Sequence, residues 1–195
     1  MVEIDVVAQA LQEFSGMDSE AFALSIPFWE VRTYKKGEFY NEYKNVCKHL
    51  GFITEGVFRS YFVNEQSGEQ RNISFFTPNQ IIGACKSLMT QTPCNYYTEC
   101  VVDSTIVYIH RTRLAELYRS DHQWEHFGRM IAEMALASLI EHTEGLFLKT
   151  PQQRYQELLK LHPDIFSTVP LYHIASYLGI QGPSLSRIRR RLAAR

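Results

Sequence analysis

The sequence predicts an α+β protein, in which an N-terminal β-roll of the jelly-roll type precedes one long helix and a C-terminal helix-turn-helix. Three observations predict this order. Short runs rich in aromatic and β-branched residues alternate with turn signals over residues 27–110, as in β-sandwiches and barrels. Apolar residues then recur at helical spacing over residues 121–149. Two short amphipathic segments separated by a glycine follow near the C-terminus.

The N-terminal segment predicts two helices before the strands. A helical stripe of apolar residues covers residues 2–14, and Asp18 can cap a short helix that ends near Leu24. Thr112 is expected to cap another short helix after the strands. Ser104-Thr105 is expected to open the last strand. The predicted strands cover residues 50–53, 57–63, 71–76, 96–102 and 105–110.

Asp121 is the expected N-cap of a long helix that runs to about Lys149. Its apolar residues cover more than one face, so we expect one side to pack on its own domain. The other side would pair with a second copy of the chain in a two-stranded coiled coil. The alternative is a helix covered entirely within the monomer.

Thr150-Pro151 is a cap followed by a first-turn proline, so a new helix is expected to begin there. His162-Pro163 is expected to stop it. The predicted domains are residues 1–120 for the β-roll, 121–149 for the long helix and 150–195 for the helix-turn-helix.

The helix-turn-helix prediction is based on residues 172–192. Gly179 can adopt the left-handed conformation that ends a helix, and Pro183 suits the first turn of the next one. Apolar residues are spaced so that two crossed helices bury one shared face. These residues are Ile174, Leu178, Ile180, Leu185, Ile188 and Leu192.

The remaining face of the second helix has the chemistry that DNA requires. A helix fits the major groove, where an arginine can bond both acceptors of a guanine edge. Residues 170–195 contain five arginines and no acidic residue, so attraction to phosphates is local. The alternative is a solvated basic tail. The predicted outward residues are Ser184, Ser186, Arg187, Arg190 and Arg191.

Bulk composition limits the other classes of function. A formal net charge of −1 gives no global attraction to nucleic acid. No apolar run is long enough to span a membrane, and the acidic N-terminus lacks a signal-peptide pattern. We therefore expect a cytoplasmic protein that does not bind membranes. The seven histidines are scattered and neither phosphate loop nor nucleophile elbow occurs, so an enzyme is not expected.

The four cysteines show no zinc-binding spacing, and in a reducing cytoplasm they are expected to be thiols. Cys85, Cys94 and Cys100 could line one cavity and sense oxidation or a metal. The alternative is that they are small buried apolar residues.

The whole pattern resembles the cyclic-AMP receptor/FNR family of bacterial transcription regulators. Lys35-Lys36-Gly37-Glu38 and the stretch 53–59 are similar to the family's early hairpins, and Phe75 to Gly83 is similar to the approach to its ligand pocket. The most specific part is Pro170 to Arg191. Ser184-Leu185-Ser186-Arg187-Ile188 and the basic residues after it look most like members from the Bacteroidetes.

The resemblance implies a homodimer built on the long helix that binds a palindromic site in double-stranded DNA. Arg187 matches a base-contacting arginine of the family, and Gln181 matches a phosphate-contacting position. Gly182 and Pro183 replace two other base-reading residues, so the DNA sequence that is recognised does not carry over. Contact with RNA polymerase has no general residue signature and is left open.

The resemblance also implies a ligand pocket, but the contacts for a cyclic nucleotide are missing. Ala84 takes the position of the carboxylate that binds the ribose, and Cys94 takes that of the phosphate-binding arginine. A buried phosphate requires a cation, so we predict that cyclic AMP does not bind and that no cofactor is needed. The expected pocket residues are Gly83, Ala84, Cys85, Cys94, Asn95, Tyr96, Tyr97 and Leu139.

Two other functions are weighed beside DNA binding. One is a jelly-roll protein that binds a small molecule or acts as a metal enzyme, with a helical tail that contacts other proteins. The other is a thiol redox switch built on the cysteines.

Overall fold

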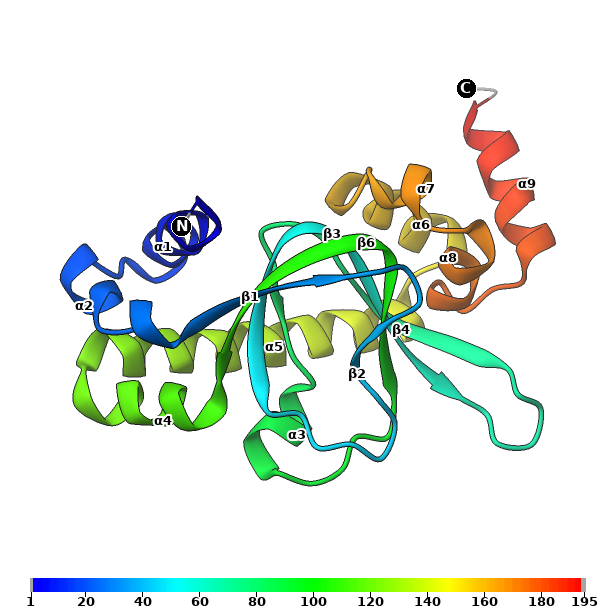
Figure 1. The fold of residues 1–195 in the computed structure, drawn as a ribbon. Coiled ribbons are helices and arrows are strands. Elements are labelled where there is room, and N and C mark those ends of the chain that lie inside the picture. Colours follow the sequence, from blue (N-terminus) through cyan, green and yellow to red (C-terminus); the bar gives the residue numbers. More distant parts are fainter. Residues whose placement is uncertain (1, 194–195) are drawn as a thin grey trace.

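The computed structural model describes residues 2–193, so Arg195, which was counted among the basic residues, lies outside the described residues. Two helices and a 3₁₀ turn come first: α1 (Val2–Ser15), α2 (Ser19–Ala23) and η1 (Ile26–Phe28). The strands are β1 (Trp29–Tyr34), β2 (Phe39–Asn41), β3 (His49–Val63), β4 (Gln70–Phe76), β5 (Ile81–Ile82) and β6 (Tyr97–His110). A short helix, α3 (Cys85–Thr90), lies between β5 and β6 (Figure 1). The later helices are α4 (Arg111–Ser120), α5 (His122–Leu148), α6 (Pro151–Leu161), α7 (Ile165–Thr168), α8 (Leu171–Tyr177) and α9 (Gly182–Ala193).

The strands form one antiparallel sheet in the order β1-β6-β3-β4, with β2 also paired to β6 and β5 to β3. The long strands β3 and β6 pair from His49↔His110 to Tyr61↔Tyr97. Because every other strand pairs with one of these two, they form the centre of the β-roll.

Two sequence predictions are wrong at the middle of these strands. The predicted breaks near residues 54–56 and 103–104 lie inside β3 and β6, so Ser104 is buried in mid-strand and does not open a strand. The pairing shifts between Ile53 and Phe58, and Gly56 has a φ of +92°, where a Cβ would overlap Ser104. Irregular pairing and a glycine bend the strands without ending them.

Most helix boundaries follow the capping residues in the sequence. The Asp121 carboxylate accepts hydrogen bonds from the backbone N–H of Gln123 and Trp124 at the start of α5, and Thr150 forms a capping box with Gln153 at the start of α6. The predicted Thr112 cap is wrong, because α4 begins two residues earlier, at Arg111, and the side chain of its N-cap His110 accepts from the Thr112 N–H. Helices α3 and α7 are too short for a periodic pattern to predict.

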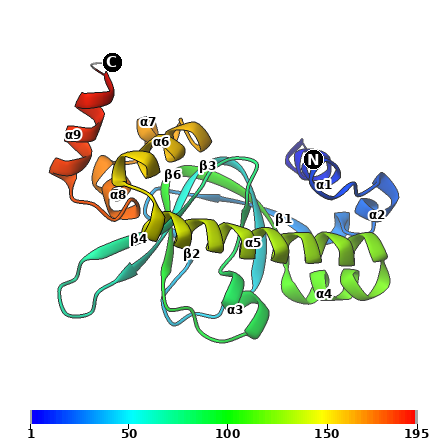
Figure 2. The same ribbon diagram turned by 180° about the vertical axis from the view of Figure 1, so that it is seen from behind.

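The first half of α5 is part of the main core. Trp124 and Phe127 are fully buried against α1, α2 and the sheet, and the Trp124 indole N–H donates to the Ala21 carbonyl at 2.8 Å. The second half of α5 crosses the back of the roll and continues to the C-terminal helices (Figure 2). Its outward face is uncovered in the monomer, which excludes a helix covered entirely by its own chain. The exposed large apolar residues are Met134, Leu136, Leu139, Ile140, Leu146, Phe147 and Leu148.

Helices α6–α9 lie at the end of the roll opposite α1, α2 and α4 (Figure 1). They do not bury a core of their own, because their apolar cluster also contains Val57, Phe75 and Val101 of the roll. The C-terminal helices are therefore packed onto the sheet. Over residues 2–193, no helix combines the length and the apolar character needed to cross a lipid bilayer.

Candidate nucleic-acid interface

The C-terminal helix pair, defined as α8 and α9 with the turn between them, is shaped by its glycine. Gly179 has a φ of +66°, a conformation that residues with a Cβ rarely adopt. This conformation lets the Ile180 N–H reach back to the Ala175 carbonyl at 3.0 Å. Gln181 then starts α9, and its carbonyl accepts from the N–H groups of Ser184 and Leu185. The chain thus leaves α8 and enters α9 within a few residues.

The residues predicted to hold the two helices together do so. Ile174, Leu178 and Leu185 are each at most 2% exposed, and Ile188 is also buried. Ile180 and Leu192 are partly buried against the same cluster. Because the apolar face of α9 is used in this way, its polar face must point to solvent.

The residues predicted to contact DNA lie on this free face. Arg187 is exposed, and its guanidinium donates to the Ser184 hydroxyl at 3.2 Å and to the Pro183 carbonyl at 3.4 Å. It therefore lies along the first turn of α9. Ser184 is half-buried beneath it. The other predicted contacts are all exposed: Gln181, Ser186, Arg190 and Arg191.

The charge of the pair is of one sign. Helix α9 contains Arg187, Arg189, Arg190 and Arg191, and residues 170–193 contain no acidic side chain. Cations that are not neutralised by nearby carboxylates attract a polyanion such as the DNA backbone. The pair is thus a local basic surface on a chain whose net charge is close to zero.

Two arginines that were not predicted from the sequence, Arg154 and Arg189, also contribute to this region. Arg189 lines a groove between α9 and α6, together with the predicted Arg190 and with Tyr155, Leu159 and Leu192. Arg154 joins three segments, since its guanidinium donates to the carbonyls of Leu178, Lys149 and Gly145 at distances of 2.7–3.3 Å. A cation at helix C-termini is favourable, so Arg154 fixes the end of α8 against the end of α5.

A buried polar cluster connects the helix pair to the roll. Arg59 of β3 is 4% exposed, and its guanidinium donates to Glu99 of β6 at 2.6 Å and to His173 of α8 at 2.9 Å. Burial is the larger cause and the charge of Arg59 the smaller one, and together they lower the pKa of His173 from 6.5 to about 4. His173 is therefore neutral at pH 7 and can accept this hydrogen bond at Nδ1.

Two of the expected pocket residues are buried in one small cluster. Ala84 and Cys94 are buried together with Cys47, and Tyr40 and Tyr96 cover them. Burial raises the pKa of Cys47 and of Tyr96, which is the direction expected in apolar surroundings. A surface hollow that shares Tyr40 and Cys47 with this cluster is lined by residues 39–42 and 45–49, a segment that sequence reasoning did not include.

The other expected pocket residues are dispersed. Gly83 lies beside Leu50 and Leu88, whereas Asn95 is exposed. Cys85 is also exposed, and its sulfur lies 3.6 Å from that of Met89.

Tyr97 stacks on Tyr61 with ring centroids 5.4 Å apart. Leu139 is 62% exposed on α5, so in the monomer it does not join Ala84 and Cys94.

The possibility that Cys85, Cys94 and Cys100 line one cavity is contradicted by the structure. Cys100 is buried in another cluster, with Ile53 and Phe58, because β6 directs it into the interior of the roll. Cys47 takes its place beside Cys94. Among residues 2–193, no three side chains of His, Cys, Asp or Glu are placed to hold a metal ion.

Comparison with known proteins identifies the class of the roll. Residues 31–121 match the family described as cyclic nucleotide-binding domain. The search of curated proteins gave no match.

Solved structures extend the likeness to most of the chain. FixK2 from Bradyrhizobium japonicum matches with a TM-score of 0.71 at 18% identity, over 85% of each chain. A protein from Eubacterium rectale assigned to the Crp/Fnr family matches with a TM-score of 0.68 at 14% identity, over 92% of this chain and 85% of that chain. The catabolite activator protein of Thermus thermophilus matches with a TM-score of 0.59 at 17% identity, over 95% of this chain and 87% of that chain.

These findings confirm the resemblance to the cyclic-AMP receptor/FNR family, for the roll through the domain match and for the chain through its fold. Residues 31–121 are similar to a cyclic nucleotide-binding domain, and the chain shares its α+β fold with the neighbour assigned to the Crp/Fnr family. The closer likeness to members from the Bacteroidetes stays a prediction.

Proposed function

We propose that this protein is a dimeric transcription regulator that binds a specific sequence of double-stranded DNA through α8 and α9, acting as a helix-turn-helix. The observation that carries this proposal is the face of α9 on which Arg187, Arg190 and Arg191 are exposed, in a segment, residues 170–193, that contains no acidic residue. An α-helix fits the major groove, and arginine supplies both base and phosphate contacts. The structural neighbour from Eubacterium rectale, which is described as a transcriptional regulator, supports the same interpretation.

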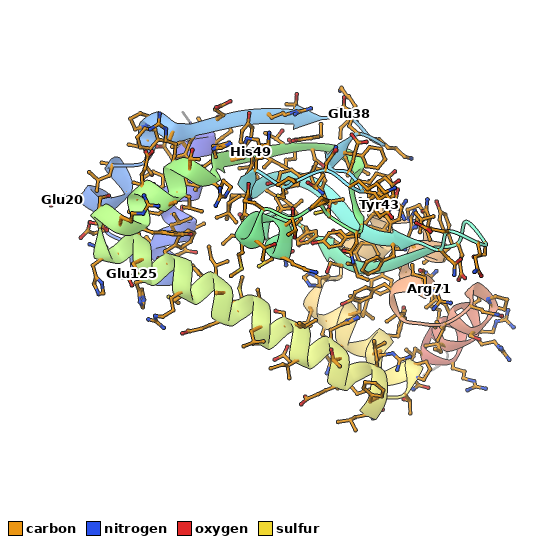
Figure 3. All side chains as sticks on the ribbon, turned by 90° about the horizontal axis from the view of Figure 1, so that it is seen from below. Glu20, Glu38, Tyr43, His49, Arg71 and Glu125 are labelled. Carbon is orange, nitrogen blue, oxygen red and sulfur yellow. The ribbon has the colours of Figure 1, made fainter. Side chains whose placement is uncertain are left out.

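The second part of the proposal is a dimer that forms along α5. Its exposed residues Leu136, Leu139 and Leu146, together with Ala132 and Thr143, follow the alternating three- and four-residue spacing of a coiled-coil seam. Seen from below, α5 crosses the molecule with its outward side chains uncovered (Figure 3). A second copy would bury these side chains and place two copies of α9 on one duplex.

The third part is that the roll does not bind cyclic AMP. Ala84 and Cys94 stand at the positions of the missing carboxylate and arginine. Both are buried in one cluster, and neither provides the cation that a phosphate requires. Lys86 is exposed and is the only lysine or arginine between Arg71 and Arg111. An anionic ligand would therefore be desolvated without a partner. We infer that no cofactor is needed and that the protein is not an enzyme.

The test is selection of binding sites from a random duplex library, followed by affinity measurements on two variants. Arg187→Ala should cost about 1–3 kcal/mol at one base position in each half-site and relax the preference there. Arg190→Ala should weaken all sequences about equally and reduce the salt dependence of binding. The two half-sites should lie about one helical turn apart or a multiple of it.

Arg119→Ala is the matched control, because Arg119 is exposed on α4, far from the helix pair in the chain. It should bind the selected site like the parent. If Arg187→Ala and Arg190→Ala also bound like the parent, α9 would not be the recognition helix. The proposal would then fail.

A further inference from the structure

We propose that Arg59 and His173 are positioning residues for DNA binding: the polar cluster between roll and α8 holds the helix pair in the orientation that meets DNA. This inference rests on the proposed function. The interface cluster consists of Arg59, Gln70, Asn72 and Glu99 of the roll and His173 and Ser176 of α8.

On the roll side, Arg59 is held in place by contacts that do not involve α8. One guanidinium nitrogen donates to Glu99 at 2.6 Å and Gln70 at 2.7 Å, and the other donates to Asn72 at 3.1 Å. The guanidinium also lies over the ring of Tyr61, with 3.9 Å from Cζ to the centroid. These contacts join β3, β4 and β6, so the roll presents a rigid donor to the helix pair.

On the helix side, two residues one turn apart complete the cluster. His173 Nδ1 accepts from Arg59 at 2.9 Å and its carbonyl accepts from the Asn72 amide at 3.3 Å. The Ser176 hydroxyl accepts from the Asn72 backbone N–H and donates to the Gln70 carbonyl, both at 3.0 Å. Helix α8 thus lies along β4 and extends its hydrogen bonding (Figure 1).

These bonds specify an orientation that apolar packing alone does not. The adjoining apolar contacts, such as Phe75 with Tyr177 at 5.3 Å between ring centroids, favour burial but have little directionality. Charge-assisted hydrogen bonds have defined lengths and angles, and an unpaired buried group is costly. Sliding or rotating α8 would break the bond from Arg59 to His173 and the bonds from Asn72 to His173 and Ser176. The cluster therefore selects one position of α8, and α9 follows it through their shared core.

In this position of α8, the proposed DNA-binding face of α9 is exposed to solvent. Arg187, Arg190 and Arg191 are exposed, while the cluster is on the opposite, buried side of the pair, at His173. The bound orientation is thus present before DNA is met, and a protein that is already ordered loses less entropy on binding. Loss of the cluster should weaken specific binding without removing the basic surface.

The experiment compares the full-length parent with His173→Leu/Ser176→Ala, which removes the bonds made by these two side chains and keeps every bond within the roll. The control His122→Leu/Ser167→Ala has the same composition at positions outside the cluster. Two measurements are made: affinity for the selected duplex and for an unrelated duplex at low salt, and hydrogen–deuterium exchange of β4 and α8.

We expect the cluster variant to bind the selected duplex at least about tenfold more weakly, as for a rotation of α8 that misplaces one base contact. Binding to the unrelated duplex should change less than about twofold, because the arginines remain. The Asn72 amide, which donates to Ser176, should exchange faster. His173→Asn should restore most of the affinity, since its side-chain oxygen can accept where Nδ1 did. The control should resemble the parent in every measurement.

Unchanged affinity and unchanged exchange in the cluster variant would overturn the inference, as would equal losses for both duplexes. If the double variant fails to fold, Ser176→Ala alone removes two of the interface bonds and must show the same pattern at smaller size. If the parent binds no duplex at all, the proposed function fails, while exchange at Asn72 still decides whether the cluster fixes α8.

Discussion

At the residue scale, the histidine between roll and helix pair illustrates how position decides chemistry. His173 is one of seven histidines, and its neighbours in sequence give no sign of a special role. Its environment consists of Arg59 from β3, which is bonded to Glu99 of β6, with Asn72 of β4 and the ring of Tyr172 beside it. A buried imidazole beside a guanidinium resists protonation.

The first prediction concerns acid stability. The pKa of His173 is about 4 in the folded protein, below its ordinary value of 6.5, which we assign to the unfolded chain. Between pH 4 and pH 6.5 the unfolded chain therefore binds more protons at this residue than the folded protein does. The stabilisation that comes from this shift should be fully present above pH 6.5 and should be lost toward pH 4. This residue should change the free energy of unfolding by at most about 1.4 kcal/mol per pH unit. Urea unfolding across this range measures the slope.

His142 and His162 shift in the same direction because of burial, so the parent alone does not isolate His173. His173→Asn retains the acceptor but cannot be protonated. It should lose stability less steeply between pH 6.5 and 4 than the parent does. Parallel curves for the two proteins would contradict this assignment.

The second prediction concerns Arg154, which bonds the carbonyls of Leu178, Lys149 and Gly145. Arg154→Met keeps the aliphatic stem but leaves these carbonyls with fewer donors. The free energy of unfolding should fall by about 2 kcal/mol, since each partly buried unpaired group is costly. Arg119→Met, an exposed change on α4, should have little effect in the same urea titration.

Arg187 could be selected from the sequence, since its place on an amphipathic helix depends only on nearby residues. Arg59 and Arg154 could not. Their partners lie on segments distant in the chain, and nothing near either residue in the sequence predicts which segment comes close.

At the element scale, α5 has two different halves. Its N-terminal half is fixed by Trp124 and Phe127 in the core, whereas Leu139 and Phe147 are 62% and 83% exposed. Such a stripe on a long helix is typical of a protein–protein contact.

The third prediction concerns this stripe. Leu139→Glu should raise the dissociation constant of the dimer by at least about a hundredfold, because two carboxylates would be buried in the seam without partners. Sedimentation velocity over a concentration series measures this change. Ala137→Glu is the control, since Ala137 is exposed and about a third of a helical turn from the stripe. A monomeric parent, or equal effects of both variants, would contradict the proposed interface.

Elements with a local determinant were predictable, and others were not. Asp121 and Thr150 begin their helices as predicted, because a side-chain cap acts within three residues. The strands β3 and β6 were each predicted as two shorter strands. Gly56 and the polar residues near it look like turn formers, but pairing with the opposite strand holds them in the sheet.

At the scale of the whole molecule, the residues that the resemblance assigns to a ligand pocket lie in a small buried cluster of the roll. Ala84, Cys94 and Cys47 pack together there. The Tyr40 hydroxyl donates to the His49 carbonyl at 2.8 Å, and the Ser87 hydroxyl accepts from the Cys47 N–H at 3.0 Å. These bonds hold the segment of residues 40–49 together and join it to α3.

The fourth prediction follows from this packing. One millimolar cyclic AMP should give no saturable heat in calorimetry and should leave the free energy of unfolding unchanged. A ligand with a dissociation constant of 10 μM would add about 2.7 kcal/mol under these conditions, which urea titration detects readily. Cyclic GMP serves as a matched anion. Saturable stabilisation by cyclic AMP alone would contradict the inference that its contacts are lost.

Local sequence patterns were sufficient to predict most of the capped helices, the amphipathic faces of α5 and α9, and the basic surface near the C-terminus, because each depends on residues a few positions apart. Long-range packing places Cys47 and not Cys100 beside Cys94. The same kind of packing docks the helix pair on the roll through Arg59 of β3 and His173, which are 114 residues apart. Such contacts depend on which surfaces the chain brings together, and no local pattern encodes that choice.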